Sequence, residues 1–382
     1  MSGVKYKMVA KTLQGLEQTL ADELKALGAE NIQLGKRAVL FEGNKHMLYK
    51  ANIWCRTALK ILVNIHSFPT ENEQELYDGI SKMNWEEYFT VDETLAVEAV
   101  LHYSNLNHSM YAALKVKDAI VDQFRTKHDK RPSVDTVAPT VLINVHIVNN
   151  ICTIALDSSG DSLHKCGYRA ANHEAPLNEV LAAGMVLMSG WDKEQPLIDF
   201  MCGSATILIE AAMIALNRAP GMLREQFAFE RWHDFDKEML KEIKDVAKFK
   251  ALKELPTQII GCDISTKAVD QALENIQYAF LTDFIDIHKM DFQDFQAPEG
   301  DLMIISNPPY GERIQTDKLF ELYKAIGSTL KQKYTGCSAW ILTSNMEAAA
   351  QIGLRASSKR SLVNGSLDCK FFRYDMYKGT RN

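Results

Sequence analysis

Residues 304–311, Ile-Ile-Ser-Asn-Pro-Pro-Tyr-Gly, end a short apolar run that begins at Leu302. Such a run predicts a buried strand. The two prolines stop it, because proline has no amide hydrogen for the next ladder bond and fixes its own φ. The backbone is therefore held open just outside the carboxyl end of a strand, which is where open α/β sheets bind ligands.

The polar groups of this stretch suit the exocyclic amine of a nucleobase. That amine is a poor nucleophile, because its lone pair is delocalised into the ring. The side-chain oxygen of Asn307 and the carbonyl of Pro308 can each accept one amine hydrogen, which favours a tetrahedral nitrogen and aims the lone pair. Tyr310 can stack on an extruded base. Taken alone, Pro-Pro-Tyr fits a stiff turn after a strand equally well, so the neighbouring strands must decide.

Composition predicts two or three globular domains. The chain has 382 residues, of which 46% are hydrophobic and 24% charged, as in ordinary soluble proteins. No apolar run approaches the ~20 residues that span a bilayer, and residues 1–7 lack the apolar core of a signal peptide. The seven cysteines include no Cys-x-x-Cys pair, which predicts free thiols in a reducing cytoplasm and no metal site.

Charge is unevenly distributed, although the net charge is only −6. Residues 355–382 carry seven Lys and Arg against two acids, and residues 115–131 carry six against three. The net charge argues against a strongly basic nucleic-acid binder. Local basic patches on a weakly acidic body instead suit a protein that finds RNA and then releases it.

The N-terminal half predicts two α+β units. The first follows the order strand, helix, strand, strand, helix, strand, which is that of a split ferredoxin-like unit. The second ends in a hairpin turned at Asn149-Asn150, followed by the polar linker 157–161. The predicted strands are 6–10, 31–34, 38–42, 59–65, 95–101, 141–147 and 151–156, and the predicted helices are 16–27, 45–53, 73–83 and 109–125.

From about residue 161 the pattern changes to alternating buried strands and helices, which predicts a parallel sheet. A charged and aromatic segment at 222–256 looks inserted, and Asn364-Gly365 predicts a type I′ hairpin near the end. Five parallel strands followed by an antiparallel hairpin is the arrangement of class I, Rossmann-like methyltransferases. The predicted strands are 197–200, 258–262, 285–288, 302–306, 339–343, 360–363 and 367–377, and the predicted helices are 207–216, 237–250, 269–279 and 319–330.

A small-residue turn follows the first of these strands, at 199–206, Asp-Phe-Met-Cys-Gly-Ser-Ala-Thr. Small residues let a backbone approach a ligand, and the next helix adds partial positive charge at its N-terminus. The candidate ligand-binding residues of this turn are Asp199, Cys202, Gly203, Ser204 and Thr206. Such a turn by itself is more often only a turn.

Acids end the next two predicted strands. Asp263 can accept both ribose hydroxyls of a nucleoside, by the logic of dinucleotide folds. It could also cap the following helix, although Ser265 is the better cap. Asp291 stands where a carboxylate can accept from an adenine amine. Their joint occurrence at consecutive strand ends, with Asn307 at the fourth, favours a ligand site over chance.

These motifs resemble those of a known enzyme family. Residues 199–206 resemble the S-adenosylmethionine-binding motif I, and residues 307–310 resemble motif IV of amino-group methyltransferases. Residues 163–169 and 175–179 resemble the segment that leads into the methyltransferase domain of THUMP-containing RNA guanine-N2 methyltransferases, the bacterial 23S rRNA type being nearest. Residues 227–232, Phe-Ala-Phe-Glu-Arg-Trp, and 362–365, Leu-Val-Asn-Gly, fit the same family.

The resemblance covers nearly the whole chain and implies its organisation. It implies an α/β protein with a ferredoxin-like domain at 1–66, a THUMP RNA-binding domain at 67–160 and a class I methyltransferase domain at 161–382. The implied cofactor is S-adenosylmethionine, and the implied acceptor is N2 of a guanine in RNA, with 23S rRNA expected first. Membrane and metal partners are not expected.

Catalysis in such an enzyme would consist mainly of aligning amine, methyl and sulfur, so no strong base is needed. The implied catalytic residues are Asn307, Pro308 and Tyr310. His164 and His173 are expected to be structural or to contact RNA. The implied cofactor-binding residues are Asp199, Cys202, Gly203, Ser204, Thr206, Asp263, Asp291 and Asn307.

The chain departs from the family pattern at two positions. The family usually has Asp-Pro followed by Cys-Gly-Ser-Gly-Thr, whereas this chain has Phe200 after Asp199 and Ala205 in place of the second glycine. The added methyl group could weaken cofactor binding. It would forbid the fold only if φ at Ala205 had to be positive.

Several alternatives stay open from the sequence. A tRNA guanine-N2 methyltransferase has a similar domain order, and Asn-Pro-Pro-Tyr does not distinguish guanine N2 from adenine N6. A non-catalytic RNA-binding or ribosome assembly factor with a degenerate cofactor pocket would explain Ala205, although Asp263, Asn307 and Tyr310 argue against it. The sequence names neither the target nucleotide nor the oligomeric state.

Overall fold

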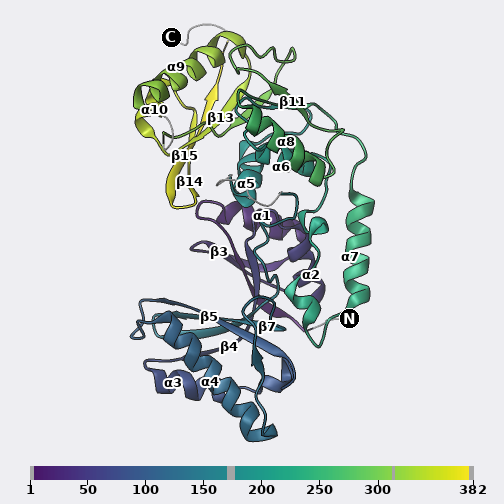
Figure 1. The fold of residues 1–382 in the computed structure, drawn as a ribbon, viewed down its shortest axis with the longest axis vertical. Helices are drawn as coiled ribbons and strands as arrows, with labels where there is room; N and C mark the ends of the chain where they lie inside the picture. Colours follow the sequence, from purple (N-terminus) through teal and green to yellow (C-terminus); the bar gives the residue numbers. More distant parts are fainter. Residues whose placement is uncertain (1–3, 170–176, 312–314, 378–382) are drawn as a thin grey trace. The chain divides into compact units, whose positions relative to one another are not determined.

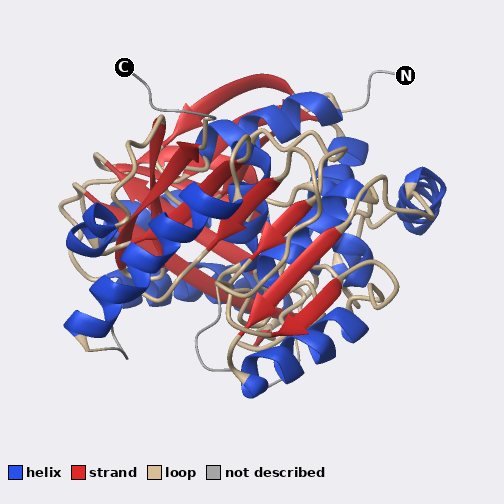
Figure 2. Cartoon of the chain, turned by 90° about the horizontal axis from the view of Figure 1, so that it is seen from above, coloured by secondary structure: helices blue, strands red, loops and turns tan. Residues whose placement is uncertain are grey.

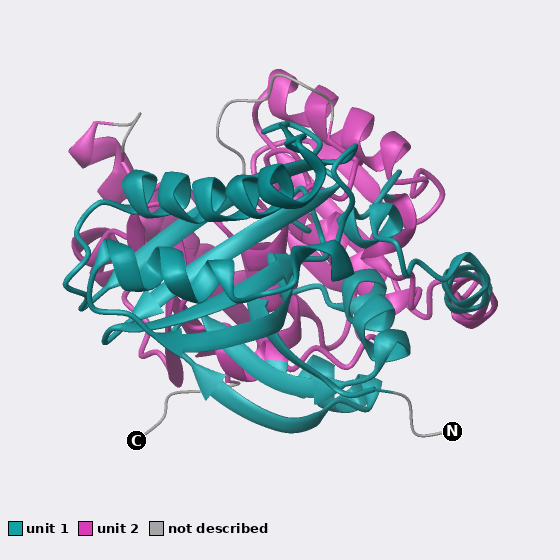
Figure 3. Ribbon diagram, turned by 90° about the horizontal axis from the view of Figure 1, so that it is seen from below, with its two compact units in different colours: residues 1–11, 21–163, 224–245 teal, residues 12–20, 164–223, 246–382 magenta. Residues whose placement is uncertain are grey.

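The computed structural model describes residues 4–169, 177–311 and 315–377 (Figure 1). Contacts divide the chain into two compact units, which Figure 3 shows in different colours. The first unit comprises residues 1–11, 21–163 and 224–245, and the second comprises residues 12–20, 164–223 and 246–382. Each unit is built on one β-sheet, and Figure 2 colours the strands and helices by type.

The first unit contains an eight-stranded sheet in the order β2-β3-β1-β4-β8-β7-β5-β6. Its strands are β1 (Tyr6–Lys11), β2 (Glu30–Gly35), β3 (Ala38–Gly43), β4 (Lys60–Pro69), β5 (Thr94–His102), β6 (Ser133–Val134), β7 (Val141–Val148) and β8 (Ile151–Asp157). The helices within residues 17–128 are α1 (Glu17–Leu27), α2 (Lys45–Trp54), α3 (Glu73–Ser81), the 3₁₀ turn η1 (Trp85–Glu87) and α4 (Ser109–His128).

The predicted ferredoxin-like order of strands and helices is confirmed. β1 pairs antiparallel with both β3 and β4, as this topology requires. Burial alternates along β3, where Val39 and Phe41 are buried and Leu40 is 41% exposed. Leu20 and Leu24 of α1 are fully buried at helical spacing.

β4 is longer than predicted and runs through both N-terminal α+β segments. The sequence predicts a strand at 59–65 closed by Pro69, but β4 continues to Pro69, which pairs with Ile151 of β8. Proline is tolerated there because it is the last residue of the strand and removes no interior ladder bond. Positions 66 and 67, where we expect the boundary between the first two domains, lie inside this strand.

Strands β5, β7 and β8 pack against α3 and α4. Leu76 and Ile80 of α3 and Val116 and Phe124 of α4 share one buried cluster with the inward side chains of the sheet. The hairpin turn at Asn149-Asn150 is confirmed, with φ angles of 50° and 60° as a type I′ turn requires. β6 was not predicted, because two residues show no alternation.

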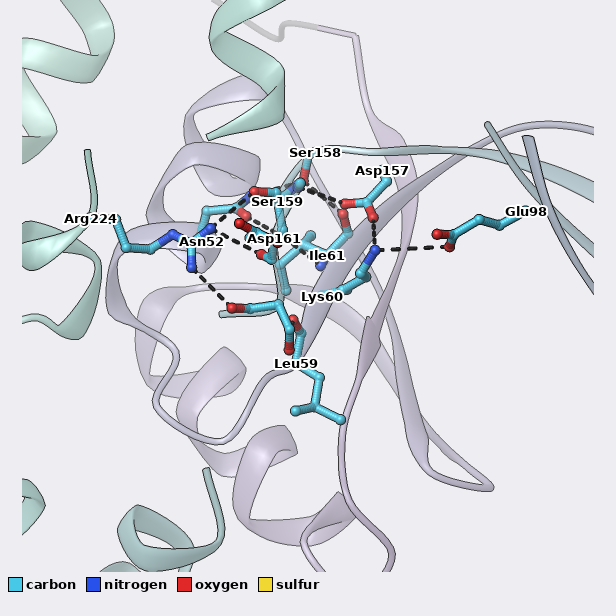
Figure 4. Close-up of polar contacts among 12 residues, drawn as sticks. Asn52, Leu59, Lys60, Ile61, Glu98, Asp157, Ser158, Ser159, Asp161 and Arg224 are labelled. Atoms are coloured by element: carbon cyan, nitrogen blue, oxygen red, sulfur yellow. Dashed lines mark hydrogen bonds and ion pairs between the residues drawn. The ribbon is translucent and has the colours of Figure 1, made fainter. Parts of the chain in front are cut away.

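A buried polar network orders the linker 157–161 (Figure 4). Asn52 Nδ2 donates to Ser158 Oγ at 2.9 Å, and Ser159 Oγ donates to Asn52 Oδ1 at 2.7 Å. Ser158 Oγ also donates to the Ile61 carbonyl at 2.7 Å, and the Ile61 amide donates to Ser159 Oγ at 2.8 Å. The small polar residues that suggested a domain boundary are therefore hydrogen-bonded in the core of the first unit.

Residues 224–245 belong to the first unit, although the sequence places them in an insertion within the methyltransferase part. Phe229, in the 3₁₀ turn η3 (Ala228–Arg231), stacks on Tyr49 of α2 with ring centroids 4.2 Å apart. Arg231 Nε donates to the Pro139 carbonyl at 2.8 Å. The aromatic residues of this segment are therefore core residues of a unit that is remote in sequence.

The second unit contains a seven-stranded sheet in the order β11-β10-β9-β12-β13-β15-β14. The predicted class I methyltransferase fold is confirmed: the first five of these strands are parallel, and β15 is antiparallel to β13 and β14. The strands are β9 (Leu197–Asp199), β10 (Ile259–Asp263), β11 (Asp286–Lys289), β12 (Met303–Ser306), β13 (Ser338–Thr343), β14 (Ser358–Asn364) and β15 (Leu367–Asp375). The remaining helices are α5 (Glu179–Ser189), α6 (Thr206–Ala215), η2 (Pro220–Leu223), α7 (Lys237–Lys250), α8 (Thr266–Tyr278), α9 (Thr316–Lys333) and α10 (Met346–Gln351).

Helices pack on both faces of this sheet. Tyr323 and Ile326 of α9 share a buried cluster with Ile304 of β12 on one face. On the other face, Gly261 of β10 lies so close to Leu208 of α6 that an added Cβ atom would come within 2.4 Å. Right-handed crossovers on the two sides of β9 place their helices on opposite faces, which explains the arrangement.

α5 is a helix that the sequence did not predict. Nine of its eleven residues are buried, so it shows no amphipathic stripe. α10 was also not predicted, because six residues are too short to show a helical period. In both cases the periodicity that identifies a surface helix is absent.

The C-terminal hairpin is confirmed, but its turn differs from the prediction. Asn364 pairs with Leu367, so the two loop residues are Gly365 and Ser366. Only Gly365 has a positive φ, at 61°, whereas a type I′ turn needs positive φ at both central residues. Gly365 is therefore the first of the two loop residues, whereas in an Asn-Gly type I′ turn the glycine is the second.

Two negative features concern the described residues only. No helix within residues 4–169, 177–311 and 315–377 has both the length and the apolar character to cross a membrane. The seven cysteines, all of which lie in these ranges, are buried free thiols.

Gly327→Ala in α9 is expected to destabilise the second unit. Alanine usually stabilises a helix interior by about 1 kcal/mol relative to glycine, but a Cβ atom here would lie 1.8 Å from the Ile352 carbonyl oxygen. The backbones must separate, so we expect a net loss of about 1–3 kcal/mol in the free energy of unfolding. Urea unfolding measures it, with Ser328→Ala on the exposed side of α9 as the control. Equal stability of the two variants would contradict this packing.

Candidate active site

The four predicted strand ends lie along one edge of the parallel sheet. β9 pairs with β10 and β12, and β10 pairs with β11, all in parallel. Asp199, Asp263, Asp291 and Asn307 end or follow these four strands, so the fold brings them to the same carboxyl edge. The chain reverses its direction of travel across the sheet between β9 and β12, and such a switch point is where open α/β sheets bind ligands.

Asp199 is the buried centre of this edge. It is 1% exposed, and Ser306 Oγ at the end of β12 donates to its Oδ1 at 2.6 Å. The Met201 amide donates to the same oxygen at 3.2 Å. Burial raises the pKa of Asp199 to about 7, with a smaller contribution from the Asp263 carboxylate, while the two hydrogen bonds oppose the rise. Asp199 therefore links the end of β12, through Ser306, to the end of β9 and to the turn that follows β9.

The turn between β9 and α6 is held by backbone and side-chain contacts. The Cys202 amide donates to the Cys262 carbonyl at 3.0 Å, and the Gly203 amide donates to Asp263 Oδ2 at 3.0 Å. Asn275 Nδ2 of α8 donates to the Ser204 carbonyl at 3.0 Å. A Cβ atom added to Gly203 would meet nothing within 4 Å, so this side of the turn is open.

Ala205 adopts the left-handed conformation, with φ 63° and ψ 21°. The positive φ was expected to forbid the fold, and this expectation is wrong: alanine is only disfavoured relative to glycine, because an L-residue pays roughly 1–2 kcal/mol in this region. Ala205 is fully buried, and burial of its methyl group offsets about 0.8 kcal/mol of that cost. The departure from the family motif is thus mainly backbone strain, and its methyl group lies in the core.

An ion pair that the sequence did not reveal supports the start of α6. Arg169 Nε lies 2.6 Å from Glu179 Oε1, and Arg169 Nη2 donates to Thr206 Oγ1 at 3.3 Å. Glu179 is 5% exposed, and burial raises the pKa of its carboxyl group while the Arg169 guanidinium opposes the rise. A glutamate at the start of the otherwise apolar helix α5 was the available signal.

Asp263 combines a structural contact with partial exposure. Its Oδ2 accepts from the Gly203 amide, and its Oδ1 accepts from the Ser265 amide at 2.9 Å. Ser265 is the N-cap of α8, since its Oγ accepts from the Ala268 amide, so the preference for Ser265 over Asp263 as the cap is confirmed. Each carboxylate oxygen has a second lone pair, which leaves capacity for a further donor.

Asp291 and Ile264 flank Asp263 at the same edge. Asp291 is half-buried beyond the end of β11, and its Oδ1 accepts from the Gln293 amide at 2.8 Å. Ile264 follows Asp263 directly and is 69% exposed. This exposed branched aliphatic side chain, beside two acids, offers apolar contact to a flat ring. No sequence motif marks Ile264.

Asn307 and Tyr310 contact each other directly. The Tyr310 hydroxyl donates to Asn307 Oδ1, the oxygen that we expect to accept from a nucleobase amine. Both side chains are half-buried, and Pro308 between them is buried. Burial raises the pKa of the Tyr310 hydroxyl well above its usual range, so it is protonated at neutral pH and acts as a donor. Asn307 Oδ1 keeps a second lone pair for an incoming amine hydrogen.

Two further residues, which the sequence analysis missed, fix the proline turn. Tyr323 Oη donates to the Pro309 carbonyl at 3.2 Å, and Asn345 Nδ2 donates to the Tyr310 carbonyl at 3.2 Å. Tyr323 was identified only as one apolar position of α9. The backbone from Asn307 onward is therefore held from below by α9 and by the loop after β13.

Three residues that the sequence analysis named cannot be placed. His173, Ala175 and Pro176 lie in 170–176, outside the described residues. Within the part of the chain that the structure describes, no group of three or more His, Cys, Asp or Glu residues could hold a metal ion.

Comparison with known families identifies the family to which this fold belongs. A family model described as RMKL-like, methyltransferase domain, matches residues 166–373, which is more than half of the chain. The chain belongs to the RMKL-like methyltransferase family. Models of an RlmL ferredoxin-like domain and of a THUMP domain match residues 7–62 and 70–157.

Individual relatives agree with this assignment. A Synechocystis protein named "Putative RNA methyltransferase" is 39% identical over 369 residues, covering 96% of each chain. The ribosomal RNA large subunit methyltransferase K/L of Syntrophotalea carbinolica is 39% identical over 382 residues, covering 97% of this chain and 53% of that protein. The chain thus spans about half the length of the K/L relatives that it matches. The solved structure of SMU.472, titled a putative methyltransferase complexed with SAH, has a TM-score of 0.90, 31% identity and full coverage of both chains.

Asp199→Asn is expected to flatten the pH dependence of stability in this RMKL-like methyltransferase. In the unfolded chain Asp199 loses its proton near pH 4, but in the folded chain it does so near pH 7. Between these values only the folded chain holds the proton, so stability falls as pH rises and stays lowered above pH 7. Asparagine cannot ionise. Between pH 5.5 and 8.5, the free energy of unfolding of Asp199→Asn should therefore rise by on the order of 2 kcal/mol relative to that of the wild-type chain.

Chemical denaturation at several pH values measures this difference. The comparison of slopes is independent of any constant cost of the amide group at position 199. A difference between variant and wild type that stays constant across this range would mean that Asp199 does not titrate between pH 4 and 7 in the folded chain.

Proposed function

We propose that the chain transfers a methyl group from S-adenosylmethionine to N2 of a guanine in RNA, with 23S rRNA as the substrate, in the cytoplasm. The family assignment and the THUMP match support RNA methylation, and the names of the K/L relatives point to large-subunit rRNA. The observation that carries the proposal is the placement of Asn-Pro-Pro-Tyr at the end of β12, where Ser306 is bonded to Asp199 at the end of β9.

The carboxyl edge fits S-adenosylmethionine by the chemistry of its residues. Asp263 is partly exposed and can accept two ribose hydroxyls, and Asp291 can accept from an adenine amine. The open side of Gly203 lets a ligand approach the backbone at the start of α6. Ile264 can cover one face of the base. When bound, this cofactor supplies a methyl group already activated on a sulfonium centre.

The residues of motif IV would activate the acceptor by position. Asn307 Oδ1 and the Pro308 carbonyl accept the two hydrogens of the guanine amine, which directs its lone pair toward the open side of the turn. These bonds strengthen as the nitrogen becomes tetrahedral and positively charged, so they favour the transition state over the ground state. The Tyr310 hydroxyl, by donating to Asn307 Oδ1, fixes which atom of the amide faces the substrate.

RNA recognition is assigned to the first unit. The THUMP match falls in this unit, and α4 ends with exposed Arg125 and Lys127, which pair with Asp122 and Glu86. Exposed cations of this kind attract phosphates without reading sequence. The first unit therefore supplies RNA affinity through its THUMP part, and the carboxyl edge of the second unit supplies the chemistry.

Nucleoside analysis of RNA from a deletion strain tests the proposal. Loss of N2-methylguanosine from 23S rRNA, restored by the wild-type chain and not by an Asn307→Ala chain, is the expected result. Loss from tRNA, or loss of N6-methyladenosine, would replace the substrate assignment. An unchanged RNA together with no affinity for S-adenosylhomocysteine would indicate a non-catalytic protein.

Asp263→Ala is expected to weaken cofactor binding at least about tenfold, because each charge-assisted hydrogen bond to a ribose hydroxyl contributes roughly 1.5–3 kcal/mol. Calorimetry with S-adenosylhomocysteine measures the affinity. Ser265→Ala is the matched control, since it removes the cap of α8 and leaves the Asp263 acceptors in place. Wild-type affinity in Asp263→Ala would show that this strand end does not hold the cofactor.

Asn307→Ala is expected to lower single-turnover methyl transfer by roughly 10²–10³, as for other preorganised polar groups at a reacting centre. Cofactor affinity should stay within about twofold, because the change affects only the acceptor side. Pro309→Ala is the control, as Pro309 is exposed and its carbonyl remains available to Tyr323. If Asn307→Ala and Pro309→Ala turn over at the same rate, the motif is only a turn.

A further inference from the structure

The ends of α6, α7 and α8 form a second surface of the methyltransferase unit. α6 and α8 run back from the carboxyl edge of the sheet, so their last residues lie at the opposite, amino edge. The loop 216–218 after α6 bonds the backbones of Lys250, Leu252 and Phe280 at 3.1, 2.8 and 2.8 Å. Three segments separated in sequence are therefore joined at this edge.

Phe280 occupies a backbone position that glycine normally fills. α8 ends at Tyr278, and the Leu281 amide donates to the Ile276 carbonyl at 3.0 Å, which is the long bond of a Schellman motif. The residue before Leu281 must be left-handed, and Phe280 has φ 56°. It is also 75% exposed, so its ring contributes little to the core. A strained backbone that presents an exposed ring points to binding rather than to stability.

The end of α7 also presents exposed apolar side chains, together with lysines. Phe249 is 90% exposed, and Leu252 is 51% exposed. Residues 246–253, Val-Ala-Lys-Phe-Lys-Ala-Leu-Lys, contain three lysines and no acid. Phe249 thus stands between Lys248 and Lys250, and this segment is bonded to the loop 216–218, which also bonds the Phe280 carbonyl.

We propose that this amino-edge surface binds unpaired nucleotides of the RNA substrate. The rings of Phe249 and Phe280 stack on bases, and the lysines face phosphates, which is the general design of single-strand RNA surfaces. Its residues are Phe249, Lys250, Leu252, Lys253, Tyr278 and Phe280. The proposal rests on the RNA methyltransferase function proposed above.

The composition of the surface favours RNA over a protein partner. Lysine is depleted in protein–protein interfaces, because its charge is costly to desolvate, whereas it is favoured where phosphates supply the opposite charge. The strands between the two edges have four to six residues at β10, β12 and β13, and so span roughly 13–20 Å. Only an RNA of more than a few nucleotides can therefore contact both edges.

Phe280→Gly in the full chain tests the proposal, since glycine removes the ring and relieves the backbone at the same time. Binding of a long labelled oligouridine, followed by fluorescence anisotropy, should weaken about tenfold. The melting temperature should not fall, and affinity for S-adenosylhomocysteine should not change. Leu273→Ala is the control, because Leu273 is an exposed residue of α8 outside the defined surface. A double Lys250→Ala, Lys253→Ala variant should lower the salt dependence, the slope of log affinity against log salt, by about 0.7 per lysine.

Unchanged oligouridine affinity in Phe280→Gly would overturn the proposal, as would an effect on sedimentation alone, which would identify a protein interface. If the wild-type chain binds no RNA, the proposed function fails together with this surface. If wild type binds and Phe280→Gly binds equally well, only this surface fails.

Discussion

The hydrogen bond from Ser306 to the buried Asp199 carboxyl group is the contact on which the candidate active site depends. It joins the last residue of β12 to the last residue of β9, the two strands between which the sheet changes direction. Asn307 follows Ser306, and the turn proposed to hold the cofactor follows Asp199. The bond therefore sets the spacing between the proposed amine acceptor and the proposed cofactor turn. Burying the carboxyl group is unfavourable, and its two hydrogen bonds offset part of that cost.

Two residues with left-handed backbone conformation, one at each edge of the sheet of the second unit, differ in burial. Ala205 precedes α6 and is fully buried, so its methyl group recovers part of the backbone strain through packing. Phe280 follows α8 and is mostly exposed, so packing of its ring offsets little of its strain. Strain that the core compensates is consistent with a structural substitution in a motif. Strain at the surface, without compensation, calls for a binding role.

The two N-terminal family matches share one sheet. The ferredoxin-like match ends at residue 62 and the THUMP match begins at residue 70, yet β4 runs from Lys60 to Pro69 and pairs with both β1 and β8. Residues 224–245 add to the same unit through the stacking of Phe229 on Tyr49. A fragment that begins at residue 161 would retain Phe229 without Tyr49, so it would expose an apolar surface. The RNA-binding part is thus one body made from three stretches of chain.

The sequence by itself determined most of the strands and helices and indicated the position of the candidate site, because these depend on local periodicity and on residues at strand ends. Asp199, Asp263, Asp291 and Asn307 could be found in this way, since parallel strands bring their carboxyl ends to one edge whatever the details of packing. Only the tertiary structure decided the contacts around the site: Ser306 bonds Asp199, and Arg169, which is paired with Glu179, bonds Thr206. It also decided the burial of α5, the membership of residues 224–245 and the positive φ of Ala205. These features depend on contacts between segments far apart in the chain, and no local pattern carries that information.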